Sequence, residues 1–126
     1  MPISRKHEDA VNAIREKMKT KGCACVEHGN VGGAEPDLVC ACEEPITLIE
    51  VETEESISKS HTRYQILIMQ QYADKNETRA AVIVADGTNL CGIPINEGGK
   101  QILEEHNLPN CPRTRANNGN EEIGRN

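Results

Sequence analysis

Three acidic residues lie at the borders of apolar segments, where folding could gather them at one point. Asp37 precedes the apolar run "LVCAC", and Glu50 and Glu52 stand one residue apart in "ITLIEVET". Because side chains alternate between the two faces of a β-strand, Glu50 and Glu52 would share one face and Val51 would point to the other. If the two segments pair as an antiparallel hairpin through "EEP", Asp37 would approach Glu50 across the strands.

Carboxylates gathered in this way can bind a divalent cation. Two or three such oxygens, a backbone carbonyl and waters form a ligand set that suits Mg²⁺ or Mn²⁺. An ion held there can bind a phosphodiester oxygen, acidify a water molecule and stabilise a leaving oxygen. Spacing alone also fits a half-exposed strand whose two glutamates face solvent, and the residue pattern leaves this alternative open.

The surrounding sequence predicts the helices and strands that would position these carboxylates. Helices are expected from Ser4 to about Lys21, over about residues 58–73 and over residues 98–107. Strands are expected over residues 23–29, 36–42, 46–53, 79–86 and 89–95. The long helix between the third and fourth strands makes those two strands parallel. The sequence therefore predicts an α/β fold with an αβββαβ core, in which helices flank a mixed central sheet.

Length and composition indicate one small domain. The 126 residues suffice for a modest core, expected within residues 1–107, and residues 108–126 read as a polar, mobile tail. Hydrophobic residues make up 37% of the chain but include neither Phe nor Trp, so aliphatic residues must fill the core. No segment approaches the roughly 18 apolar residues of a membrane span, and the charged start lacks an apolar signal segment. These features predict a cytoplasmic protein without a membrane partner.

Charge is distributed unevenly along the chain. Nine acidic residues and no Lys or Arg occur between residues 22 and 58, and the formal net charge is −6. Apolar residues interleave with these acids, so the segment should be folded, and repulsion among its carboxylates favours a bound cation. A negative chain argues against nucleic-acid binding by charge alone, which leaves the basic face of the first helix as the expected phosphate contact.

The pair "PD" and, about a dozen residues later, "IEVET" resemble the motif of the PD-(D/E)XK nucleases, the restriction-endonuclease-like superfamily. The resemblance covers roughly residues 4–86 and is strongest to the small archaeal Holliday-junction resolvases, whose first helix bears a glutamate matched here by Glu8. It implies metal-dependent cleavage of DNA or RNA, often by a homodimer. It further implies that Asp37, Glu50 and the carbonyl of Val51 bind Mg²⁺ or Mn²⁺, with Glu8 as a helper carboxylate.

One position departs from that family. Glu52 replaces the family's lysine, and it is expected to act as general base or as ligand of a second metal ion. Lys59 is a candidate for the missing positive charge, although an exposed lysine at a helix start needs no such role. Gln65 lies on the second helix, where relatives of this fold often place an active-site glutamine, although a boundary residue with satisfied hydrogen bonds needs no such role. The competing hypothesis is a catalytically decayed nuclease fold that acts in binding or assembly.

Six cysteines add a third hypothesis. Cys23 and Cys25 would share a face of one strand, and Cys40 and Cys42 a face of the next, so four thiols could bind zinc or an iron–sulfur cluster. Cysteines on strands of a cytoplasmic protein are more often small buried hydrophobes, which is the preferred interpretation here, and disulfides rank last. The other two cysteines show no pairing pattern.

Overall fold

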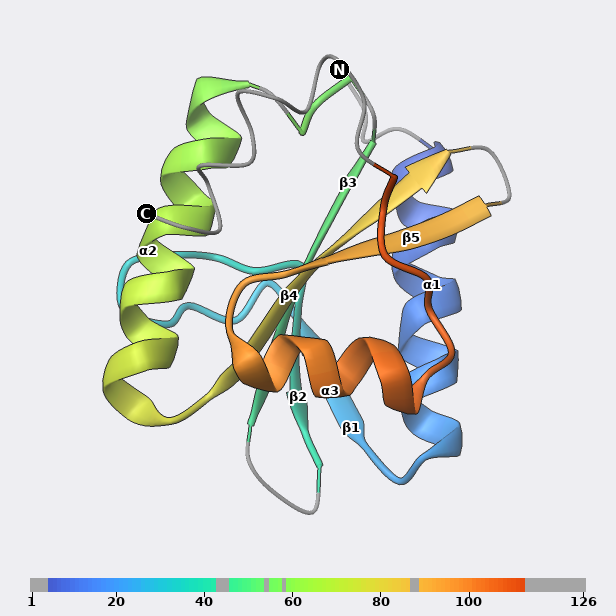
Figure 1. Ribbon diagram of the computed structural model, residues 1–126, viewed down its shortest axis with the longest axis horizontal. Coiled ribbons are helices and arrows are strands. Elements are labelled where there is room, and N and C mark those ends of the chain that lie inside the picture. Colours follow the sequence, from blue (N-terminus) through green and yellow to red (C-terminus); the bar gives the residue numbers. More distant parts are fainter. Residues whose placement is uncertain (1–4, 43–45, 54, 58, 87–88, 113–126) are drawn as a thin grey trace.

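The computed structural model describes residues 5–42, 46–53, 55–57, 59–86 and 89–112 (Figure 1). Its elements are α1 (Arg5–Thr20), β1 (Ala24–Glu27), β2 (Leu38–Ala41), β3 (Thr47–Thr53), α2 (Ser60–Asn76), β4 (Arg79–Asp86), β5 (Asn89–Pro94) and α3 (Glu97–Glu105). The predicted order of helix, three strands, helix and strand is confirmed, and the expected fifth strand and short helix follow it. None of the described helices combines the length and hydrophobicity needed to cross a membrane.

The five strands form one mixed sheet in the order β1-β2-β3-β4-β5. β3 and β4 run parallel, because α2 crosses over between them, and every other neighbouring pair is antiparallel. α1 and α3 cover one face of the sheet, and α2 covers the other (Figure 1). The structure therefore confirms the predicted mixed sheet with flanking helices.

Each face of the sheet has its own apolar core, and β3 contributes to both. Ile49 and Val51 pack on the α1 face with Ile14 and Met18, whereas Leu48 packs on the α2 face. All residues of β3 except the last are buried. Neither face of a strand that is covered on both sides is exposed to solvent. A polar side chain in such a strand therefore needs a hydrogen-bond partner inside the protein.

α2 continues beyond its predicted end. The buried apolar residues of this helix stop at Ala73, but the helix runs on through polar residues to Asn76. Glu77 ends it in the left-handed conformation (φ 54°), and its backbone N–H donates to the carbonyl of Ala73. The final turn depends on this backbone cap, which a pattern of apolar residues does not report.

The folded unit extends past residue 107, where the sequence placed its end. Leu108 is buried, and Gly92 of β5 exchanges backbone hydrogen bonds with Pro109 (2.7 Å) and Cys111 (2.9 Å). A disulfide also joins Cys111 to β5. Residues up to Cys111 thus pack with the domain, whereas residues 113–126, the rest of the expected mobile tail, lie outside the described residues.

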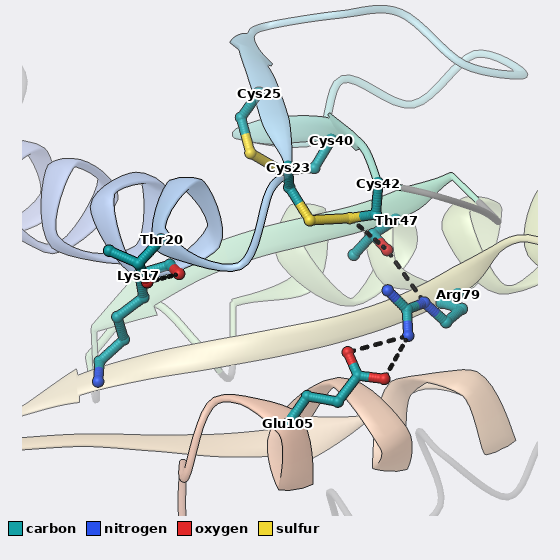
Figure 2. The surroundings of a disulfide bond; sticks show 9 residues. All are labelled: Lys17, Thr20, Cys23, Cys25, Cys40, Cys42, Thr47, Arg79 and Glu105. Atoms are coloured by element: carbon teal, nitrogen blue, oxygen red, sulfur yellow. Dashed lines mark hydrogen bonds and ion pairs between the residues drawn. A yellow bond between two sulfur atoms is a disulfide. The ribbon is translucent and has the colours of Figure 1, made fainter.

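The cysteines form three disulfide bonds, which corrects the sequence-based preference for buried free thiols. Cys25 pairs with Cys40 directly opposite it on β2, and Cys23 pairs with Cys42 two residues further along the same hairpin (Figure 2). No cysteine of the described chain is free, so the thiol-ligated zinc or iron–sulfur hypothesis has no ligands in this structure. The preference failed because cysteine spacing does not report the register of β1 on β2, which sets Cys25 directly opposite Cys40.

A buried arginine holds the same end of the sheet. Arg79 is 7% exposed, and its Nε donates to Thr47 Oγ1 of β3 (3.2 Å). Its Nη1 donates to both carboxylate oxygens of Glu105 in α3 (3.1 and 3.2 Å) (Figure 2). These bonds tie β3, β4 and α3 together at the start of β3, away from the glutamates near its end.

His106 should make the protein less stable in mild acid. This histidine is buried, and its Nε2 has no hydrogen-bond partner among the described residues. Burial lowers its pKa below the ordinary value of 6.5; Glu105 opposes this, and neighbouring lysines and Arg79 lower it further. Because the unfolded chain then takes up a proton at higher pH than the folded one, stability is present above pH 6.5 and is lost below it, by at most about 1.4 kcal/mol per pH unit.

Urea unfolding at pH 7.5 and 5.5 measures this effect. The His106→Gln variant should lose less stability between the two pH values than the wild type does. His61→Gln, at an exposed position of α2, serves as the control and should behave as the wild type. An unchanged pH dependence in His106→Gln would contradict the assignment of this acid sensitivity to His106.

Candidate functional site

Glu50 and Glu52 are buried in β3 on the face that α2 covers. They are 5% and 7% exposed, so the alternative of a half-exposed strand with solvent-facing glutamates is wrong. The predicted alternation holds, because Ile49 and Val51 pack on the opposite face. Carboxylates are rarely buried without a partner, so two of them in one central strand require a specific arrangement around them.

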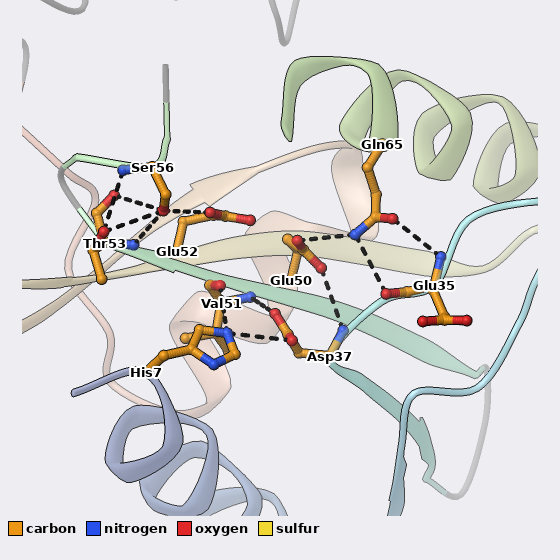
Figure 3. Close-up of polar contacts among 9 residues, drawn as sticks. All are labelled: His7, Glu35, Asp37, Glu50, Val51, Glu52, Thr53, Ser56 and Gln65. Carbon is orange, nitrogen blue, oxygen red and sulfur yellow. Dashed lines mark hydrogen bonds and ion pairs between the residues drawn. The ribbon is translucent and has the colours of Figure 1, made fainter. Parts of the chain in front are cut away.

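Asp37 and Glu50 lie side by side, as the predicted hairpin requires. Leu38 pairs with Ile49 in the antiparallel register of β2 and β3, which places Asp37 opposite Glu50. The backbone N–H of Asp37 donates to Glu50 Oε1 (3.3 Å), and Asp37 Oδ2 accepts from the backbone N–H of Val51 (2.8 Å) (Figure 3). These bonds hold both carboxylates where the chain enters β2 beside the end of β3.

Gln65 and Ser56 orient the two glutamates. Gln65 Nε2 donates to Glu50 Oε2 (2.9 Å), and the same amide exchanges hydrogen bonds with the backbone of Glu35 (3.2 and 3.3 Å) (Figure 3). Ser56 Oγ donates to Glu52 Oε1. The structure places Gln65 beside Glu50, in keeping with the position expected for it. Ser56 was not singled out, because a serine in a polar loop gives no signal in the sequence.

Burial and the neighbouring charges favour the neutral form of Glu50 in this arrangement. Its pKa is raised to about 11, first by burial, then by hydrogen bonding with Glu52 and by the charges of Asp37 and Glu52, while the bond from Gln65 opposes the shift. The proton on Glu50 thus relieves a repulsion that a cation would relieve in another way.

His7 joins this site, although the sequence analysis did not identify it. Its Nε2 lies 3.3 Å from Asp37 Oδ1 and 3.1 Å from the carbonyl oxygen of Val51 (Figure 3). The hydrogen bond to Asp37 raises the pKa of His7 above its ordinary value, against the opposing effect of burial. A signal was present, because His7 lies one helical turn before Val11 and two turns before Ile14, which α1 buries against the sheet.

Glu8 and Lys59 stand apart from the buried carboxylates. Glu8 is exposed and lines, together with His7 and Asp37, a pocket of about 250 Å³ beside α1. Lys59 is exposed at the N-cap of α2, and none of the ion pairs between described residues joins it to the site. The structure therefore offers no support for Lys59 as a substitute for the family's lysine.

The carboxylates fit a divalent ion that is held by few protein ligands. Among the described residues, no three His, Cys, Asp or Glu side chains form a group that could hold a metal ion on their own. Mg²⁺, however, usually binds through one or two carboxylates and keeps several waters. Asp37 and Glu50 provide two carboxyl groups. The carbonyl oxygen of Val51 and Asp37 Oδ1 both lie within 3.3 Å of His7 Nε2, so this carbonyl is close to the Asp37 carboxylate. The hard oxygen donors of these two carboxyl groups suit such an ion.

Replacing Glu50 by a side chain that cannot ionise should stabilise the folded protein. The pKa of Glu50 is 4.5 in the unfolded chain and about 11 in the folded protein. A carboxyl group with a raised pKa contributes its full stability below pH 4.5, and this contribution is lost as the pH rises towards 11. Glu50→Gln removes the ionisable group and keeps one acceptor oxygen, so it retains one of the two hydrogen bonds that Glu50 accepts from Asp37 and Gln65. We expect the variant to be more stable than the metal-free wild type at pH 7, by up to about 3 kcal/mol.

Urea unfolding in the presence of a chelator measures this gain. Glu104→Gln, an exposed carboxylate on α3, is the matched control and should change stability by less than about 0.5 kcal/mol. A Glu50→Gln variant that is markedly less stable than the wild type at pH 7 would show that Glu50 is charged in the folded protein.

Comparison with known proteins gives a distant structural likeness. No protein-family model and no curated protein matches the chain. Among solved structures it is similar to a Holliday junction resolvase from the archaeal hyperthermophile Archaeoglobus fulgidus, with a TM-score of 0.48 and 15% sequence identity. The match covers 67% of this chain and 74% of that chain. Likeness at this level does not transfer an activity or a substrate to this protein.

Proposed function

We propose that this chain is a divalent-metal-dependent nuclease that hydrolyses phosphodiester bonds, with DNA as the expected substrate and RNA as the alternative. The adjacent carboxyl groups of Asp37, which is partly buried, and Glu50, which is buried, carry the proposal. The backbone N–H of Asp37 donates to Glu50 and that of Val51 donates to Asp37, and the ion pairs between described residues give Asp37 a partner only in His7 and give Glu50 none. Such a pair is destabilising in itself, which points to a role that needs carboxylates at this place.

Asp37, Glu50 and the carbonyl of Val51 would hold Mg²⁺ or Mn²⁺. When bound, the ion supplies the positive charge that offsets charge developing on the phosphate and its leaving oxygen. Glu52, on the same face of β3 as Glu50, would accept a proton from the attacking water as general base. Its hydrogen bond from Ser56 keeps the carboxylate oriented for that transfer.

Gln65 and Glu8 would support these residues. Gln65 donates to Glu50 and so fixes the direction of that carboxylate. Glu8 lines the pocket that opens beside Asp37 and would act there as a helper carboxylate. We further expect a homodimer, because one small domain with a single site covers little of a nucleic-acid duplex.

The cytoplasmic location expected from the sequence stays a prediction. Three disulfide bonds are common in proteins of oxidising compartments and in the intracellular proteins of hyperthermophiles. A cytoplasmic location would therefore fit the second of these settings.

Cleavage assays test the proposed function directly. The purified protein should nick or cut at least one member of a panel of plasmid, linear duplex, single-stranded, branched DNA and RNA substrates with Mg²⁺ or Mn²⁺, and excess chelator should stop the reaction. The second candidate is a non-catalytic binding module, which is favoured by the glutamate at position 52 and by the lack of a ready-made metal group among the described side chains. Nucleic-acid binding without metal-dependent cleavage of any substrate would support that module instead.

A further inference from the structure

The first turns of α2 carry positive charge without a neighbouring acid in the sequence. Lys59 and Arg63 are exposed there, and none of the ion pairs between described residues includes either of them. Residues 59–73 contain no Asp or Glu, although the chain has 20 acidic residues. The positive end of the helix dipole lies at the same place, because α2 begins at Ser60. This part of an acidic protein therefore attracts anions.

An exposed tyrosine lies among these cations. Tyr64 is 66% exposed, more than any other large hydrophobic residue of the described chain, and Leu67 is 40% exposed. Helical spacings of three and four residues make neighbours of Ser60, Arg63, Tyr64 and Leu67 on the outward side of α2. Together with Lys59, these four residues form the α2 patch.

The α2 patch adjoins the candidate site. Tyr64 directly precedes Gln65, whose amide donates to Glu50 Oε2 (2.9 Å) (Figure 3). Consecutive side chains of an α-helix point about 100° apart, so Tyr64 faces solvent while Gln65 points to the buried carboxylates. A nucleic-acid strand with a phosphate at the carboxylates would therefore pass the α2 patch a few nucleotides further along.

We infer that the α2 patch binds an unpaired stretch of the nucleic-acid substrate, with one base stacked on Tyr64 and phosphates at Lys59 and Arg63. This inference deepens the proposed nuclease function and rests on it. Proteins bind single strands by combining cations along the backbone with aromatic rings on which bases stack. In a continuous duplex, neighbouring base pairs cover both faces of each base. The substrates are therefore single strands, or duplexes with a single-stranded part.

Charge distinguishes this ligand from a second copy of the chain. Tyrosine and arginine are also common in protein interfaces, so their presence alone does not choose between the two. Two α2 patches placed against each other would bring together the unpaired Lys59 and Arg63 of both copies, and like charges oppose such a contact. A phosphate backbone instead neutralises these cations.

Fluorescence anisotropy of labelled oligonucleotides tests the α2 patch separately from the metal. Titrations with the full chain in excess chelator compare a single strand with a duplex of the same sequence. Tyr64→Ala removes the stacking ring, Tyr64→Phe keeps a ring, and Arg63→Gln removes one positive charge. The matched controls are Val26→Ala, at an apolar position that is 61% exposed on β1, and Lys100→Gln, at an exposed cation on α3.

The Tyr64→Ala variant should bind the single strand at least about fivefold more weakly than the wild type, and the duplex about equally well. Tyr64→Phe should bind the single strand as the wild type does, because its ring still stacks. Arg63→Gln should reduce the slope of log affinity against log salt for the single strand by about 0.7. Both control variants should keep the affinity and the slope of the wild type.

The outcomes separate the α2 patch from the proposed chemistry. Equal single-strand affinities of Tyr64→Ala and the wild type would overturn the inference, and metal-dependent cleavage by the wild type would still support the nuclease. A changed sedimentation of Tyr64→Ala with unchanged oligonucleotide affinity would assign the patch to a second copy of the chain instead. Binding of single strands that depends on Tyr64, without cleavage of any substrate, would support the patch and overturn the proposed function.

Discussion

The Asp37→Asn variant is expected to lose metal-dependent cleavage by at least about hundredfold while it keeps its fold. Asparagine retains an oxygen that can accept from the backbone N–H of Val51, and the backbone bond from residue 37 to Glu50 is unaffected. What disappears is one negative charge of the proposed metal site, and the loss of a charged ligand weakens the electrostatic stabilisation that the ion provides. Initial rates of plasmid nicking at saturating Mn²⁺, together with thermal unfolding, measure both parts of this expectation.

The matched control for this variant is Asp74→Asn. Asp74 is exposed on α2, so its replacement removes the same charge from the chain without touching the carboxylate pair. This control should cleave at the wild-type rate. Wild-type activity in Asp37→Asn would place the catalytic centre elsewhere in the protein.

Local patterns in the sequence were sufficient to predict the arrangement of the carboxylates. The β-branched segment "ITLIEVET" indicates a strand, and alternation along it separates Glu50 from Val51. A hairpin connection makes the preceding strand antiparallel and so brings Asp37 near Glu50, and the observed register, with Leu38 opposite Ile49, places the two directly opposite each other. Each of these steps involves neighbours in sequence or one hairpin, which is why the prediction succeeded.

Features that depend on distant packing could not be predicted in the same way. Whether Glu50 and Glu52 are buried depends on α2 packing across that face of β3. The residues of the strand alone do not show whether a helix covers them. The contact between His7 and Asp37 depends on where α1 settles against the sheet. The family resemblance directed attention to Glu8, although the spacing from Val11 places His7, the residue before Glu8, on the inward face of α1.

The cysteine pairing shows how far the site depends on the hairpin that bears Asp37. Cysteine spacing predicted shared faces but not the register between β1 and β2, and only the register sets Cys25 directly opposite Cys40. The two hairpin disulfides lie on either side of one Ala–Ala pair and enclose the whole segment from β1 to β2, including Asp37. The backbone that delivers Asp37 to the site is therefore covalently closed.

Removing both hairpin disulfides by Cys→Ala substitutions should destabilise the protein by about 5 kcal/mol, which is enough to unfold many domains of this size. Cys25–Cys40 and Cys23–Cys42 close nested loops with sequence separations of 15 and 19. When one is removed, the other still restricts the unfolded chain, so each single loss should be smaller, about 2 kcal/mol. Urea unfolding of the two single-disulfide variants and of the combined variant measures these differences.

Cys91–Cys111 provides the matched control, because it closes a loop of similar sequence separation, 20, with no second disulfide around it. Its removal alone should destabilise the protein by about 3 kcal/mol, more than the loss of either hairpin disulfide. This ranking follows from nesting and not from loop length. Equal effects for all three single losses would contradict it, and six reactive thiols in the purified, unreduced protein would show that the disulfides do not form. Mn²⁺ affinity should decline in the combined variant only, since Asp37 keeps its place while one hairpin disulfide remains.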